Sequence, residues 1–290
     1  MKNFKILIPV YNDWQSLSKL LSDIDNEIIN IDHKVSVIII DDGSTFDRQI
    51  NTNNLSNLDT IKIITMKENR GHARCIAAGL KFIYEKEEFD YIIPMDGDGE
   101  DRPEEIIEFI KATEKNPDYS IVGQRVKRSE AFIFKICYFL HKIITLVFTG
   151  HSIKFGNFTC LTKTTVEKLI NEKATWNSFS GALTKIEKNK ISISSIRGTR
   201  YFGPSKMSFP NLLNHSLAII SVFKKTVLIR SALFIVIYIF LIRSYASIIM
   251  LTPFILLLLM IYSISSLSLR ENIEEFNNSL TNISNIENLK

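Results

Sequence analysis

The stretch Tyr91-Ile92-Ile93-Pro94-Met95-Asp96-Gly97-Asp98-Gly99-Glu100-Asp101 joins a short apolar run to acidic residues separated by glycines. A run of this length, bounded by turn residues, is typical of a buried β-strand. A second apolar run, Val35–Ile40, ends in a similar way in Asp41-Asp42-Gly43-Ser44. Ligands bind at the carboxyl ends of parallel strands. We therefore expect both acidic clusters to line one binding site.

Further apolar runs extend this pattern over the N-terminal part of the chain, at Phe4–Pro9, Ile61–Met66 and Tyr119–Val122. Helical patterns separate most of them, at Trp14–Asn30, at His72–Glu88 and from Pro103 onward. Strands that alternate with helices predict an α/β fold in which helices cover both faces of a largely parallel sheet.

The overall composition describes a folded chain with few special features. Hydrophobic residues make up 46% and charged residues 23%, which excludes a disordered chain. The net charge of +4 leaves no basic surface typical of nucleic-acid binding. Cys75, Cys137 and Cys160 form no CxxC pair, which argues against a disulfide framework or a zinc site and favours a reducing compartment.

The apolar residues are concentrated near the C-terminal end. Between Ser231 and Leu269 only Arg243 is charged, and Thr226–Ile242 and Ser247–Leu267 form apolar stretches. They are about 17 and 21 residues long, and a helix needs roughly 20 residues to cross a bilayer. We expect a hairpin of two transmembrane helices, and a buried core hairpin is the alternative.

Flanking charges predict the orientation of this hairpin. Lys224, Lys225 and Arg230 precede or begin the first span, whereas the connecting turn carries only Arg243. Positive charge stays on the cytoplasmic side. Both the N-terminal domain and the C-terminus should therefore be cytoplasmic, and the polar start Met1-Lys2-Asn3 does not resemble a signal peptide. The short first span is compatible with helix association in the bilayer and so with a homo-oligomer, although the sequence does not determine the oligomeric state.

These patterns divide the chain into four expected segments: a catalytic domain at 1–210, an interfacial juxtamembrane helix at 211–225, two transmembrane helices at 226–268 and a polar cytoplasmic tail at 269–290. The tail has little to bury, so we expect it to be mobile. The apolar segment 131–149 fits either an amphipathic surface on the membrane or ordinary core packing, and the same choice applies to 211–225.

The acidic loop has the composition of a cation site. Asp96, Asp98 and Glu100 occupy alternate positions, and the intervening glycines permit a tight conformation in which carboxylate oxygens converge. Oxygen ligands suit Mg²⁺ or Mn²⁺. A solvated turn is the alternative, which the second acidic strand end makes less favourable. The chain has neither a Walker A sequence nor GxGxxG after its first strand, so P-loop and dinucleotide-binding folds are not indicated.

Seven motifs together resemble those of family 2 glycosyltransferases of GT-A fold. They are Ile8-Pro9-Val10-Tyr11-Asn12, Asp41-Asp42-Gly43-Ser44, Asn69-Arg70-Gly71-His72, Met95-Asp96-Gly97-Asp98-Gly99-Glu100-Asp101, Gly123-Gln124-Arg125, Gly156-Asn157-Phe158 and Arg200-Tyr201-Phe202-Gly203-Pro204-Ser205-Lys206. The last three look like the polyprenyl-phosphate branch, which contains dolichyl-phosphate mannose synthases and bacterial GtrB-like enzymes. The resemblance covers about residues 4–225, and the two-span hairpin that follows is similar to the GtrB-like arrangement.

The resemblance implies a Rossmann-like GT-A nucleotide-diphospho-sugar transferase domain and a metal-dependent enzyme that uses Mg²⁺ or Mn²⁺. Such an enzyme transfers a sugar from a nucleotide-diphosphate sugar, with inversion, to an undecaprenyl- or dolichyl-type polyprenyl phosphate. The lipid bilayer would then hold the acceptor as well as the protein, and transfer would take place at the cytoplasmic membrane face.

The resemblance also assigns residues. The nucleotide sugar would contact Pro9, Tyr11, Asp13, Ile40, Asp42, Asp96, Gly97 and Asp98. The metal would be held by Asp96, Asp98 and Glu100. The catalytic set would be Asp98, Arg125, Arg200 and Lys206. The acceptor phosphate would meet Arg125, Arg128, Arg200 and Lys206. The family commonly has Glu at the position of Asp13. His72 and Arg74 fit either a functional role or packing at the start of a helix.

Two other functions fit parts of the sequence. A hydroxyl acceptor on a glycolipid or glycan would need a general base, for which Asp101 is the remaining carboxylate, although a loop or helix-capping role also fits that residue. A non-catalytic membrane subunit of a glycan-assembly complex would not need the full set of acidic and basic residues. A lipid phosphate is already anionic and needs positioning by Arg side chains, which favours the polyprenyl phosphate acceptor.

Overall fold

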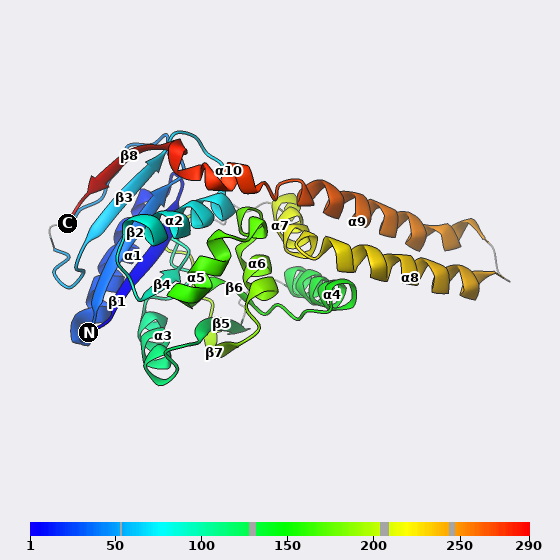
Figure 1. The fold of residues 1–290 in the computed structure, drawn as a ribbon, viewed down its shortest axis with the longest axis horizontal. Helices are drawn as coiled ribbons and strands as arrows, with labels where there is room; N and C mark the ends of the chain where they lie inside the picture. Colours follow the sequence, from blue (N-terminus) through cyan, green and yellow to red (C-terminus); the bar gives the residue numbers. More distant parts are fainter. Residues whose placement is uncertain (53, 128–131, 204–208, 244–246) are drawn as a thin grey trace.

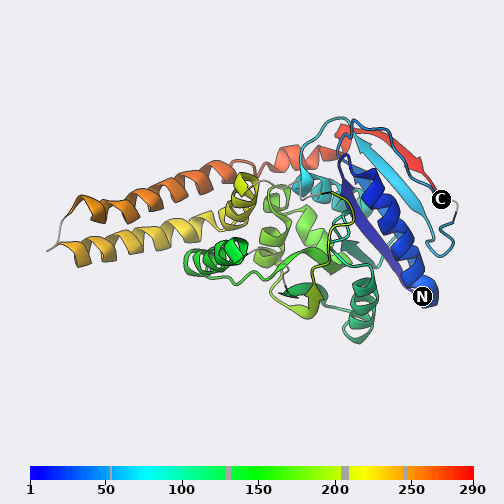
Figure 2. The same cartoon turned by 180° about the vertical axis from the view of Figure 1, so that it is seen from behind.

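The computed structural model describes the chain except for residues 53, 128–131, 204–208 and 244–246 (Figure 1). A sheet-containing domain occupies one end of the molecule, and two long helices extend from it (Figures 1 and 2). Arg128 and Lys206, which the sequence predicts to contact phosphate, lie outside the described residues.

The strands that the sequence predicts are all present in one eight-stranded sheet with the order β7-β5-β6-β4-β1-β2-β3-β8. The strands are β1 (Asn3–Val10), β2 (Lys34–Asp41), β3 (Ile61–Met66), β4 (Tyr91–Pro94), β5 (Ser120–Lys127), β6 (Phe155–Thr162), β7 (Lys190–Ile196) and β8 (Ile283–Asn288). β1 is parallel to β2 and β4, β2 to β3, and β5 to β7, whereas β6 and β8 pair antiparallel to their neighbours. The expected α/β class with a largely parallel sheet is confirmed.

Helices cover both faces of the sheet. They are α1 (Trp14–Glu27), α2 (His72–Lys86), α3 (Glu104–Lys115), α4 (Phe132–Thr149), α5 (Lys163–Ile170), α6 (Phe179–Ile186), α7 (Phe209–Ser221), α8 (Lys224–Ile242), α9 (Thr252–Ser268) and α10 (Ile273–Asn277). Successive β1 side chains point to opposite faces. Leu7 accordingly joins the core under α2, and Ile6 joins the core under α1 and α3.

Helices α8 and α9 pack against each other and project beyond the domain (Figures 1 and 2). Both are long and apolar enough to cross a membrane. Their large apolar side chains remain open to the surroundings, as in Ile229, which is 71% exposed, and Leu256, which is 61% exposed. Exposed apolar surface of this extent marks contact with lipid or a partner. The two helices therefore indicate membrane association, and the core-hairpin alternative is not supported.

The expectation of a mobile C-terminal tail is wrong. After α9 the chain returns to the domain, where β8 pairs with the edge strand β3 and matches Ile286 to Ile64. Phe276 in α10 is fully buried and stacks on Trp176, with ring centroids 5.3 Å apart. The tail is polar on average, but it orders through main-chain hydrogen bonds to an open sheet edge and through one buried ring. Average composition does not reveal either contact.

The apolar segment at 131–149 forms α4, which contacts α8. Among its described side chains, Phe139, Leu140, Leu146 and Val147 are exposed. At the C-terminal end of α4, Arg230 Nη1 donates to the carbonyl oxygen of Val147 at 2.7 Å. A cation at this position satisfies an orphan carbonyl and complements the helix dipole. The apolar surface of α4 is thus fixed beside the start of the hairpin.

Candidate active site

The two acidic strand ends meet on either side of β1. Met95 donates its main-chain N–H to Leu7, and Asp42 donates its own to Val10, at 3.0 and 2.9 Å. A Cβ on Gly97 would lie 3.2 Å from Ile8 Cγ2 and 3.3 Å from the carbonyl oxygen of Pro9. The acidic loop therefore lies directly against the end of β1, as strand order and the absence of a side chain at Gly97 together require.

Asp96 is held by polar side chains from two other elements. Its Oδ1 lies 3.0 Å from His72 Nε2 at the start of α2, and accepts a 3.2 Å hydrogen bond from Asn157 Nδ2 in β6. Burial raises the pKa of Asp96, but His72, Arg125 and the Asn157 hydrogen bond outweigh burial and hold that pKa below its ordinary value. Asp96 is therefore an ionised carboxylate, and His72 lies in the site.

Asp98 is bridged to Asp13 by one guanidinium. Arg200 Nη1 donates to Asp98 Oδ2 at 2.7 Å, and Nη2 of the same side chain pairs with Asp13. Burial and then repulsion from Asp96 raise the pKa of Asp98. The structure thus gathers three residues that the sequence assigns to the site, and it joins the acidic loop to the start of α1.

Asp101 is buried and contacts both the main chain of the acidic loop and Arg125. It is 3% exposed, its Oδ2 accepts the main-chain N–H of Asp96 at 2.9 Å, and its Oδ1 lies 3.6 Å from Arg125 Nη2. Burial and then repulsion from Asp96 raise the pKa of Asp101 to about 7. Arg125 also lies over Gly156, where a Cβ would be 3.0 Å from Nη2. These contacts fit a role in holding the loop and Arg125.

A loop after β7, residues 197–203, lies against the acidic loop. Gly198 and Tyr201 donate main-chain N–H groups to the carbonyl oxygens of Glu100 and Asp98, at 2.8 and 3.0 Å. The Arg197 guanidinium pairs with the Glu100 carboxylate, and the Tyr201 hydroxyl donates to Asp23 at 2.6 Å. Sequence reasoning did not identify Arg197 and gave Tyr201 no role. Their contacts are tertiary, and only the motif around Arg200 hinted that this loop belongs to the site.

The three carboxylates that the sequence assigns to a divalent cation have different partners in the structure. Among the residues that the structure describes, no group of three or more His, Cys, Asp or Glu side chains is arranged to hold a metal ion. Glu100 pairs with Arg197 instead of converging with Asp96 and Asp98, so its assignment as a metal ligand remains a prediction. Mg²⁺ is commonly held by one or two carboxylates together with substrate phosphates. Asp96 and Asp98 are two carboxylates of this kind, facing His72 and Arg200, and their binding of a cation remains a prediction.

Asp42 has a different environment from the one that its predicted nucleotide contact suggests. It is 4% exposed, and its two oxygens accept the main-chain N–H groups of Arg70 and Gly71 at 2.8 and 2.9 Å. The carboxylate therefore anchors the loop before α2, and contact with a nucleotide stays a prediction. Pro9 and Ile40 are buried at the strand ends, whereas Tyr11 is exposed.

A hollow of about 560 Å³ lies beside the end of β1. Its lining includes Asp13, and the other residues are Asn12, Trp14, Gln15, Thr45, Phe46, Asp47 and Gln49. Ligand sites commonly have volumes of a few hundred Å³ or more. Asp13 both lines this hollow and pairs with Arg200, so the hollow adjoins the candidate site.

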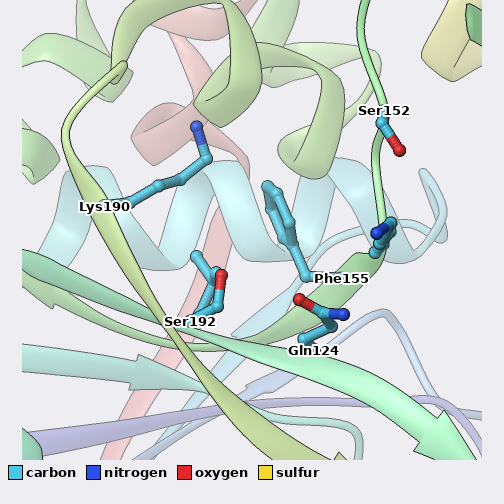
Figure 3. Close-up of a pocket in the computed structure, with 7 residues that line it drawn as sticks. Gln124, Ser152, Phe155, Lys190 and Ser192 are labelled. Carbon is cyan, nitrogen blue, oxygen red and sulfur yellow. The ribbon is translucent and has the colours of Figure 1, made fainter.

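A second, smaller pocket belongs to the other face of the sheet. It measures about 220 Å³, and Figure 3 shows Gln124, Phe155 and Lys190 around it. Neighbouring strand residues face opposite sides. Gln124 lines this pocket, whereas Arg125, the next residue, reaches Asp101 in the acidic loop. None of the residues that line this pocket is among those described above as contacting the acidic loop.

Comparisons with known proteins agree with this geometry. Residues 5–155 match the model of the family described as "Glycosyl transferase family 2". Two relatives are named undecaprenyl-phosphate 4-deoxy-4-formamido-L-arabinose transferase. The protein from Proteus mirabilis is 25% identical over 223 residues, which cover 72% of this chain and 64% of the relative. The one from Klebsiella pneumoniae is 25% identical over 229 residues, covering 74% and 65%. The chain thus spans less than two thirds of the length of either relative.

Solved structures show the same fold. Glucosyl-3-phosphoglycerate synthase from Mycobacterium tuberculosis, in complex with Mn²⁺, UDP and glucosyl-3-phosphoglycerate, superposes with a TM-score of 0.56. The match covers 78% of this chain and 80% of that one, at 10% sequence identity. At this identity the likeness concerns the fold alone. It confirms the GT-A fold that the motifs imply.

The contact between Gly99 and Tyr201 provides a stability test of the loop arrangement. Gly99 has φ +87°, and a Cβ there would lie 2.5 Å from the Tyr201 ring, whereas Gly203 has φ +68° and nothing within 4 Å. A side chain at positive φ costs about 1–2 kcal/mol, and overpacking adds about 1–3 kcal/mol. We expect Gly99→Ala to lower the free energy of unfolding by about 2–5 kcal/mol and Gly203→Ala by about 1–2 kcal/mol.

Denaturant unfolding of both variants, with and without Tyr201→Ala, measures the difference. In the Tyr201→Ala background the two glycine variants should become equally destabilising, because the collision at residue 99 is removed. Equal losses in the presence of Tyr201 would show that the 197–203 loop does not lie against the acidic loop.

Proposed function

Because the chain belongs to glycosyl transferase family 2, we propose that it transfers a sugar from a nucleotide-diphosphate sugar to a polyprenyl phosphate, with inversion at the anomeric carbon. The observation that carries the proposal is the meeting of the acidic loop with Arg125 and Arg200 at the end of β4. The names of the curated relatives, which specify undecaprenyl phosphate, support this choice of acceptor.

The acidic loop would serve the departing diphosphate. A Mg²⁺ or Mn²⁺ ion held by Asp96 and Asp98 would neutralise the charge that accumulates on the diphosphate as the glycosidic bond breaks. The Mn²⁺ and UDP in the M. tuberculosis synthase structure support this assignment by analogy of fold. Asp13 and the hollow beside it would accept the nucleoside part of the donor, next to the exposed ring of Tyr11.

The basic side chains would hold the acceptor phosphate. Arg125 and Arg200 already lie against carboxylates of the acidic loop, and a guanidinium binds two phosphate oxygens at once. Lys206 and Arg128 are proposed for the same phosphate from the sequence alone. An oxygen of that phosphate would form a bond to the anomeric carbon while the bond to the diphosphate breaks, and the electron pair would leave with the diphosphate.

The environment of Asp101 favours a phosphate acceptor over a hydroxyl acceptor. A hydroxyl must lose a proton, so it needs a general base whose oxygen is free to receive that proton. Asp101 is buried, and its oxygens face the Asp96 main chain and Arg125. A lipid phosphate is already anionic and requires no base. Asp101 is therefore assigned to holding the loop.

The membrane hairpin would place this site beside its lipid substrate. We propose that the catalytic domain comprises 1–210 together with 269–290, which returns to the sheet, that 211–225 is the juxtamembrane helix and that 226–268 forms two spans. Helix α7 has both buried and exposed apolar side chains: Ile219 and Ile220 are buried, whereas Leu213 is exposed. The exposed apolar side chains of α4, next to α8, suit the bilayer surface. Lys224, Lys225 and Arg230 favour a cytoplasmic location for the domain.

Product formation tests the proposed reaction. Purified chain in detergent, with Mg²⁺ or Mn²⁺, undecaprenyl phosphate and a panel of nucleotide sugars, should yield a lipid-linked monosaccharide that mass spectrometry detects. Asp98→Asn should lower the rate by about 100-fold or more, because an electrostatic group at the site of charge development is lost. Asp32→Asn, an exposed carboxylate elsewhere, is the matched control and should retain the rate. Absence of product with every donor, or full activity of Asp98→Asn, would contradict the proposal.

Cysteine labelling tests the proposed topology. Cys75 and Cys160 are buried and should not react with the reagent. In a chain that carries Cys137→Ser, a single introduced cysteine is then the residue that reports labelling. We expect a membrane-impermeant maleimide to label Ser247→Cys, at the N-terminal boundary of the second span, only from outside intact cells. Asn285→Cys, in β8, should react only in inverted vesicles. Labelling of both positions from the same side would rule out a hairpin that spans the membrane.

A further inference from the structure

The loop before α2, residues 68–72, connects the two acidic strand ends. Arg70 and Gly71 donate their main-chain N–H groups to the two oxygens of Asp42 at 2.8 and 2.9 Å. Two residues after Arg70, His72 Nε2 lies 3.0 Å from Asp96 Oδ1. Gly71 adopts φ +95°, a conformation that favours glycine. The position of this loop therefore sets the surroundings of both Asp42 and Asp96.

The other side of the same loop is held by the C-terminal segment. Glu275 in α10 receives hydrogen bonds from Arg70 Nη1 at 2.9 Å and Arg74 Nη2 at 3.3 Å, so that one carboxylate bridges two guanidinium groups. Burial lowers the pKa of Arg74, and nearby Arg270 and Arg70 lower it further, whereas Glu275 acts in the opposite direction. Without the Glu275 charge, Arg70 would keep its pair with Glu68, whereas Arg74 would face the charges of Arg70 and Arg270.

Glu275 is itself fixed to the domain. Asn272 caps α10, because its side-chain oxygen accepts the main-chain N–H groups of Glu274 and Glu275, each at 3.0 Å. Phe276 stacks on the Trp176 ring. The Arg74 guanidinium also lies over the Trp176 ring, 5.3 Å from its centroid. The Glu275 carboxylate therefore has a fixed position, because α10 is capped and packed against the domain.

We propose that Glu275 is a positioning residue for the nucleotide-sugar site: it holds the 68–72 loop in the conformation that engages Asp42 and places His72 against Asp96. This inference rests on the proposed function of that site. It assigns a role in the site to the segment that follows the membrane hairpin. The site is complete only after the chain has passed through both hairpin helices and returned to the domain, so the hairpin does more than anchor the enzyme.

The effect of losing Glu275 follows from a shift in loop population. When a ligand binds only one conformation, its apparent affinity falls by the fraction of molecules in that conformation. Loss of a hydrogen bond between charged groups shifts such an equilibrium by about tenfold or more. We therefore expect Glu275→Gln to weaken binding of the nucleotide by about tenfold and to raise KM for the donor more than it lowers kcat. Glu275→Asp, which keeps the charge, should restore part of the affinity.

Two measurements on the full chain in detergent separate the possible results. Hydrogen–deuterium exchange reports the 68–75 region in the absence of any ligand, and calorimetry with Mn²⁺ and UDP, GDP, ADP or dTDP reports nucleotide binding. Glu274→Gln is the matched control, because Glu274 is the exposed neighbour in the same helix. We expect Glu275→Gln, but not Glu274→Gln, to speed exchange at 68–75 and to weaken binding.

Unchanged exchange and unchanged affinity in Glu275→Gln would overturn the proposal, and so would equal effects of the two glutamine variants. Faster exchange at 68–75 in Glu275→Gln, with no nucleotide bound by the unmodified chain, would support the link between Glu275 and the loop while counting against the proposed function. The two hypotheses can therefore fail separately.

Discussion

Negative charge that is buried at the end of β4 has to be compensated, and much of the fold is arranged around that need. Asp96, Asp98 and Asp101 lie within one short loop, where each carboxylate repels the others. Their partners come from different elements: His72 from α2, Arg200 from the loop after β7 and Arg125 from β5. Catalysis of diphosphate departure would use the same property, since a loop that attracts cationic groups this strongly can also hold a divalent cation.

The sequence allowed the central part of the sheet to be predicted because those strands are buried on both faces and read as apolar runs. The interior strand β6 was not predicted, because its sequence Phe-Gly-Asn-Phe-Thr-Cys-Leu-Thr has no continuous apolar run. The two edge strands were not predicted because they are more polar or more exposed. β7 alternates Lys, Ile and Ser and is largely exposed, and β8 is mostly polar. β8 forms by hydrogen bonding to main-chain groups of β3 that would otherwise be unpaired at the sheet edge. Those groups are in place only when the sheet has assembled. Tail composition alone therefore suggested mobility.

In the candidate site too, residues within sequence motifs could be predicted, whereas residues that act through contacts in the folded chain could not. Asp96, Asp98, Arg125 and Arg200 were identified from motifs, and the structure brings them together. Arg197 and Glu275 were not identified, because each acts through a partner roughly a hundred residues or more away in the chain. Asp42 was assigned to the nucleotide, whereas its oxygens hold the 68–72 loop. A carboxylate that binds main-chain N–H groups looks the same in a sequence as one that binds a ligand.

Linkage between metal and nucleotide tests the central claim, that Asp96 and Asp98 act on the diphosphate through a divalent cation. Calorimetric titration of Mn²⁺ into the purified chain, with and without a saturating nucleoside diphosphate, measures that linkage. We expect each ligand to tighten binding of the other by the same factor, because binding free energies are reciprocal, and we expect Asp98→Asn to abolish the effect. Nucleotide affinity that is the same with and without Mn²⁺, or linkage that persists in Asp98→Asn, would contradict it.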